Sequence, residues 1–66
     1  MNNYTVRHYY TNPRNNEEIA GLSKEEAIVE AKKMTSDESG SSSAIFKNGE
    51  LVADRDWSKK NLSWSR

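Results

Sequence analysis

The chain has no cysteine, and among its 66 residues it has one histidine, one proline and three glycines. Without cysteine there is neither a disulfide bond nor a thiolate metal site, so stability must come from packing. The lone histidine, His8, has no cysteine partner, and a general base also needs a pocket. We therefore expect His8 to be a structural or surface residue, and we identify no catalytic, cofactor-binding or metal-binding residues.

The chain also lacks a surplus of charge, because ten basic residues balance ten acidic ones. Nucleic-acid-binding proteins usually carry a basic surplus, so the balance disfavours that role. The charge is nevertheless uneven. Residues 17–38 hold seven acids and three lysines, for a net charge of −4, whereas the segments on either side each carry +2.

Long apolar runs are absent as well. No segment approaches the roughly 20 apolar residues that span a bilayer, and the first residues lack the apolar part of a secretory signal. We expect a cytoplasmic protein with no membrane partner. Hydrophobic residues make up 33% of the chain, and its mean hydropathy is −1.04. A chain of this size buries only about 60% of its unfolded surface, so a homodimer could supply further burial.

The clearest positive signal is Asn48-Gly49 between two short apolar runs, which predicts a two-residue β-hairpin over 44–54. With Lys47 opposite Glu50, regular alternation predicts that Phe46 and Leu51 share an apolar face that packs on a helix. Ile45 and Val52 would then share the other face. A slip of one residue would exchange the two faces.

A helix is predicted from about Lys24 to Thr35. Ser23 and Glu26 have the spacing of a capping box, in which each side chain bonds the other residue's backbone N–H. One side of this helix carries an apolar stripe, which we expect to pack on a sheet. Its members are Ala27, Ile28, Ala31 and Met34. Val29 lies off this stripe. It is either a solitary exposed residue or a contact for the C-terminal tail.

The remaining segments complete an α+β prediction: one helix on a three- or four-stranded antiparallel sheet, in the order β(β)αββ with a C-terminal Asn-Gly hairpin. Residues 4–11 are β-branched and aromatic and predict the first strand. Residues 17–20 form either a short strand or part of a loop, and 36–43 read as a loop. We predict a domain over 1–56 and an aromatic, basic tail over 57–66.

Aromatic and basic side chains are the candidates for partner contacts, since such residues dominate protein interfaces. The candidate contacts are Arg7, Tyr9, Arg14, Trp57, Lys60 and Trp64. Trp64 either docks on the sheet over Ile45 and Val52 or is offered to another molecule. The same side chains could instead stack on bases and contact phosphates, so a small single-stranded nucleic-acid-binding protein is the alternative.

The layout also resembles a class of small phage-encoded accessory proteins, which includes anti-CRISPR proteins and host-takeover inhibitors. The resemblance rests on the helix entry Gly21-Leu22-Ser23 with Glu26-Ala27 and on Asn48-Gly49. It implies a protein that binds and blocks a host or defence protein in the host cytoplasm. These motifs are structural, so no functional residue is carried over from the class.

Overall fold

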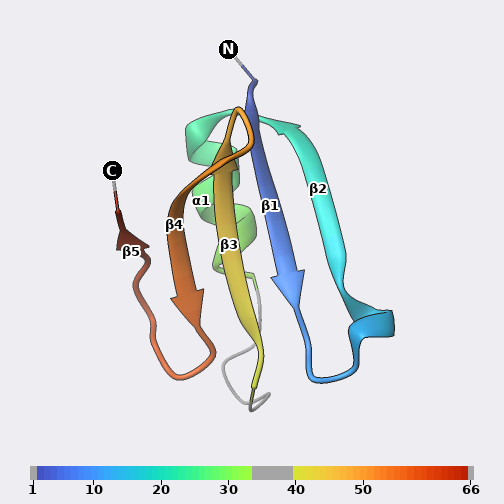
Figure 1. The fold of residues 1–66 in the computed structure, drawn as a ribbon. Coiled ribbons are helices and arrows are strands. Elements are labelled where there is room, and N and C mark those ends of the chain that lie inside the picture. Colours follow the sequence, from blue (N-terminus) through green and yellow to red (C-terminus); the bar gives the residue numbers. More distant parts are fainter. Residues whose placement is uncertain (1, 34–39, 66) are drawn as a thin grey trace.

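The computed structural model describes residues 2–33 and 40–65. A single helix covers one face of an antiparallel sheet whose strand order is β2-β1-β3-β4-β5 (Figure 1). The elements are β1 (Tyr4–Tyr9), the 3-10 turn η1 (Pro13–Asn15), β2 (Glu17–Leu22), α1 (Lys24–Ala31), β3 (Ser42–Lys47), β4 (Glu50–Asp56) and β5 (Ser63–Trp64). The α+β class is confirmed. The described part of the sheet has five strands, however, rather than the three or four predicted.

The strand limits differ from those predicted: β1 ends at Tyr9 instead of residue 11, β4 continues past residue 54 to Asp56, and β2 and β3 are also longer than expected. The short strand proposed at 17–20 is present and continues to Leu22. β3 begins at Ser42, inside the segment predicted to be a loop. Pairing explains the two extensions, since β2 and β3 each lie along β1 and gain ladder hydrogen bonds there. Residues 36–39 of that predicted loop lie outside the described residues, whereas Gly40 and Ser41 belong to no helix or strand.

The helix begins as its sequence indicates. The Ser23 hydroxyl accepts a hydrogen bond from the Glu26 N–H at 3.2 Å, and the Glu26 carboxylate accepts one from the Ser23 N–H at 2.9 Å. The predicted end was wrong, because the helix stops at Ala31 with Lys32 as its cap. Arg55 contributes to this end by donating to the Ala31 carbonyl at 3.4 Å, a group that a helix terminus leaves unpaired. Met34 and Thr35 lie outside the described residues.

β3 and β4 form a hairpin about Asn48-Gly49, but its faces are the reverse of those predicted. Phe46 lies opposite Leu51, whereas Ile45 lies opposite Ala53, so Val52 is an extra residue in β4. A bulge of this kind breaks the alternation of a strand. From Ala53 onward the β4 side chains therefore change faces relative to Leu51, so Ala53 packs against the helix as predicted although Leu51 does not.

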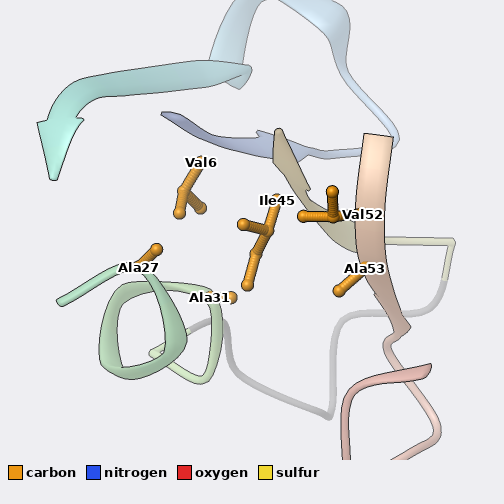
Figure 2. Packing of buried hydrophobic residues seen from close by; sticks show 6 residues of the cluster. All are labelled: Val6, Ala27, Ala31, Ile45, Val52 and Ala53. Atoms are coloured by element: carbon orange, nitrogen blue, oxygen red, sulfur yellow. The ribbon is translucent and has the colours of Figure 1, made fainter. Parts of the chain in front are cut away.

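The core lies between α1 and the sheet. Ala27 and Ala31 of the helix meet buried side chains of three strands in one cluster (Figure 2). The strand members of the cluster are Val6, Ile45, Val52 and Ala53. Phe46 and Leu51, which were predicted to pack on the helix, lie on the other face instead. Leu51 is 43% exposed, because α1 covers the face of β3 that carries Ile45 and not the face that carries Phe46.

Residues 57–65 turn back along β4 and end in β5, where Trp64 pairs with Ala53. The Ser65 N–H donates to the Val52 carbonyl at 2.9 Å, and Leu62 packs against the core. Within the described part of the chain, no helix is long and apolar enough to cross a membrane.

Candidate functional site

One face of the sheet is left open on the side away from α1 (Figure 1). Cross-strand register places three rows of residues on it, because directly paired residues in neighbouring strands point to the same side. The rows are Thr5–Phe46–Leu51, Arg7–Ala44–Asp54 and Tyr9–Ser42–Asp56. We call these nine residues the open face. None of the helices and strands assigned in 2–33 and 40–65 covers it.

Arg7 organises one half of the open face. Its guanidinium carbon lies 4.8 Å from the centroid of the Phe46 ring, and its Nε donates to the Glu18 carboxylate in an ion pair. Hydrogen bonds with the Tyr9 side chain and with Glu18 raise the pKa of Arg7, so it is charged at any physiological pH. The Arg7 side chain thus links β1 to Glu18 of β2 and to the Phe46 ring of β3.

The other half of the open face is a shallow depression of about 330 Å³. Phe46 and Leu51 line its apolar part, and the two carboxylates of Asp54 and Asp56 line another part. Both aspartates are exposed, and no ion pair joins either one to a described residue. The depression therefore combines apolar surface with negative charge that is free to attract a cation.

The structure brings together only two of the six residues proposed as contacts, Arg7 and Tyr9. Arg14 is exposed in η1, Lys60 is exposed beyond β4, and Trp57 is half-buried in the turn that follows β4. They do not belong to the nine open-face residues.

Trp64 lies at the far edge of the sheet in β5. It is 42% exposed, and the Lys24 Nζ is 5.2 Å from the centroid of its ring. With Val52 it lines a depression of about 420 Å³. Trp64 had been predicted to dock over Ile45 and Val52 if it did not contact another molecule. Ile45 instead belongs to the buried core.

Seven of the nine open-face residues were not among the sequence candidates, and they include Phe46, Leu51, Asp54 and Asp56. Alternation had assigned Phe46 and Leu51 to the core. The spacing of the two aspartates did indicate a shared strand face, but which face they occupy depends on the bulge at Val52.

His8 lies in a buried row of polar side chains on the helix side of the sheet. Its Nδ1 is 2.7 Å from the Ser43 hydroxyl, and its Nε2 is 3.9 Å from a Glu30 carboxylate oxygen. This sequence of contacts, from serine to histidine to glutamate, is the arrangement in which an enzyme's nucleophile is activated by a base that an acid orients. Ser43 is fully buried, however, so its hydroxyl meets no substrate in this conformation. We assign the row to the core, where each polar group needs a partner.

No protein-family model matches this chain, and neither a curated protein nor a solved structure matches it. The functional argument therefore rests on the open face and on the physical chemistry of its side chains.

Proposed function

We propose that the chain is a non-enzymatic protein-binding module that contacts its partner through the open face. The observation that carries the proposal is the fixed position of Arg7 above Phe46 on a sheet face that no described element covers. Arginine and aromatic residues supply most of the energy at protein interfaces. A side chain already held by neighbours loses less conformational freedom on binding, which favours affinity.

The charges of the open face favour a protein partner over a nucleic acid. Arg7 is neutralised by Glu18, while Asp54 and Asp56 are exposed on the same face. A phosphate backbone would meet repulsion there instead of the positive groove that single-strand binding uses. A protein surface with an apolar centre and a lysine or arginine at its edge fits both the depression and the aspartates.

One specific form of this proposal is an inhibitor that occupies the binding surface of a host or defence protein. Its support is the type resemblance to small phage-encoded proteins, together with an uncovered, shallow contact face on a very small domain. Such a protein acts by covering a surface, and it needs only shape and charge complementarity to do so.

The test is affinity capture from a lysate of the source cell, followed by measurement of the affinity for each captured protein. Leu51→Lys should weaken binding of the specific partner by about tenfold or more, since it puts a charge at the apolar centre of the contact. Val29→Lys is the matched control. It makes the same kind of change at an exposed apolar residue of α1, away from the open face.

Two results would contradict the proposal. One is a partner whose affinity is unchanged by both Leu51→Lys and Phe46→Ala. The other is binding of single-stranded oligonucleotides that weakens steeply as salt rises, the behaviour expected of phosphate contacts. The second result would establish the nucleic-acid alternative.

A further inference from the structure

A second apolar surface lies at the opposite side of the sheet, between β2 and α1. Ile19, Leu22 and Val29 line a groove of about 390 Å³ there. Ile19 and Leu22 pair with Val6 and Tyr4 of β1, so their side chains point to the helix side of the sheet. The groove exists because α1 packs mainly over β1 and β3 and leaves the β2 margin incompletely covered.

Val29 is the most exposed large apolar residue of the described chain, at 60%. The sequence left two interpretations for it, a solitary exposed residue or a contact for the C-terminal tail. The tail is excluded as a cover, because β5 lies at the other edge of the sheet (Figure 1). Val29 is also not solitary, since it shares the groove with Ile19 and Leu22.

The groove runs beside a free strand edge. Among the described strands β2 pairs only with β1, so alternate residues along its other side turn their N–H and C=O groups outward. Pairing with β1 is regular from Glu17 to Ile19. It then shifts at Ala20-Gly21, where two residues lie opposite Thr5. An added strand would therefore find its regular backbone partners in the first half of β2.

The charges around the groove are mainly acidic. Glu25 and Glu30 line it from α1, and Glu17 begins the adjacent strand. Glu30 already pairs with Lys33 at 3.0 Å. No ion pair joins Glu17 or Glu25 to another residue within 2–33 and 40–65, so both carboxylates are available to a partner. A second copy of this chain paired edge to edge would bring two acidic strands together, which opposes self-association here.

We propose that the groove binds an extended, basic segment of a partner protein by strand addition to β2. Apolar side chains on one face of the segment would enter the groove against Ile19 and Val29, and lysines or arginines at the two ends of that same face would lie near Glu17 and Glu25. Backbone hydrogen bonds supply affinity in this mode of recognition, and alternate side chains supply specificity. The surface is separate from the open face, so it stands independently of the function proposed above.

The test uses a capped heptapeptide, Lys-Thr-Val-Thr-Val-Thr-Lys, whose lysines and valines share one face of a strand, titrated into the isotope-labelled protein and followed by NMR. We expect saturable shifts at Ile19, Val29 and the β2 amides, with slower amide exchange at alternate residues of β2. The same peptide with both lysines replaced by glutamate should bind at least about tenfold more weakly, because its charges then face the like charges of Glu17 and Glu25. N-methylation of alternate backbone nitrogens should abolish binding by removing hydrogen bonds to β2.

Matched variants separate the two surfaces. Val29→Lys should weaken binding of the basic peptide by about tenfold, because it replaces an apolar contact by a like charge. Leu51→Lys, the same change on the open face, should leave the peptide affinity unchanged. Three outcomes would overturn the inference: no saturable shifts at millimolar peptide, equal binding of the acidic peptide, or shifts on α1 without protection of β2 amides.

Discussion

Arg55 shows how one side chain can join distant parts of a small domain. It is only 6% exposed, although a strand arginine is usually solvated. Its Nε donates to the Lys59 carbonyl at 2.8 Å, and its Nη1 donates to the Ala31 carbonyl at 3.4 Å. A cation at the C-terminus of a helix also complements the helix dipole. Arg55 thus ties the end of α1 to the turn that follows β4.

Two buried serines differ in their hydrogen bonding. The Ser43 hydroxyl is paired with His8, whereas the Ser41 hydroxyl has no hydrogen-bond partner among the residues described. Both are almost fully buried. A buried polar group stabilises a protein only when it is paired, and it destabilises when it is not.

We therefore predict opposite effects for the same substitution at these two positions. Ser43→Ala leaves a ring nitrogen of His8 without its partner and should lower the free energy of unfolding by about 1–3 kcal/mol. Ser41→Ala removes an unpaired hydroxyl and should be neutral or stabilising by up to about 1 kcal/mol. Urea denaturation measures both. The prediction is contradicted if Ser41→Ala is the more harmful of the two.

At the scale of the elements, the capping box makes the start of α1 sensitive to acid. Hydrogen bonds from the backbone and side chain of Ser23 lower the pKa of Glu26 from its ordinary value of 4.5. A carboxyl group whose pKa is lower in the folded state stabilises the fold above its unfolded pKa. That contribution is lost as the pH falls through the lower, folded value.

The corresponding prediction concerns the slope of stability against pH. Glu26→Gln keeps the capping geometry but removes the titration, so stability should fall less steeply than in the parent protein as the pH drops below 4.5. Glu25→Gln is the control, since no hydrogen bond joins that carboxylate to another described residue. Thermal unfolding at a series of pH values gives the slopes. Parallel curves for the parent protein and Glu26→Gln would refute the argument.

The elements that the sequence predicts are those whose signals are local. The capping residues Ser23 and Glu26 are three positions apart, and the turn residues Asn48 and Gly49 are adjacent, both with a positive φ. The features that the sequence does not predict depend on residues far apart in the chain. The bulge at Val52, the pairing of β5 and the contact of His8 with Ser43, 35 positions away, each require the assembled sheet.

The candidate site divides in the same way. Arg7 and Tyr9 were predictable as neighbours, because residues two apart share a strand face. The spacing of Asp54 and Asp56 indicated that they share a strand face. It did not show that this is the face that carries Arg7 and Tyr9. The exclusion of Trp64 from the open face was not predictable either, since it depends on the path of residues 57–63 around the edge of the sheet.

The whole molecule has two layers, so burial is concentrated on one side of the sheet. Ile45 is fully buried against α1, while Leu51 on the open face is 43% exposed. A domain of this size seldom has more than about 3–5 kcal/mol of stability. Its tolerance of substitution should therefore depend strongly on which layer a residue faces.

We predict that losing one carbon from Ile45 is more harmful than losing three from Leu51. Ile45→Val should lower the free energy of unfolding by about 0.5–1.5 kcal/mol, whereas Leu51→Ala should change it by less than about 0.5 kcal/mol. Chemical denaturation under one set of conditions compares them. If Leu51→Ala proves the more destabilising, the open face is part of the core, and its role as a contact surface fails.

The position of Val52 in β4 affects the fold through the pairing of the strand and not through the contacts of its own side chain. As the extra residue of the bulge in β4, it determines which face of the sheet each later side chain of the strand occupies. Were Val52 instead held inside a regular ladder, strict alternation would turn Arg55 out to solvent and drive Asp54 and Asp56 beneath the helix. The bulge therefore decides which side chains of β4 reach the core.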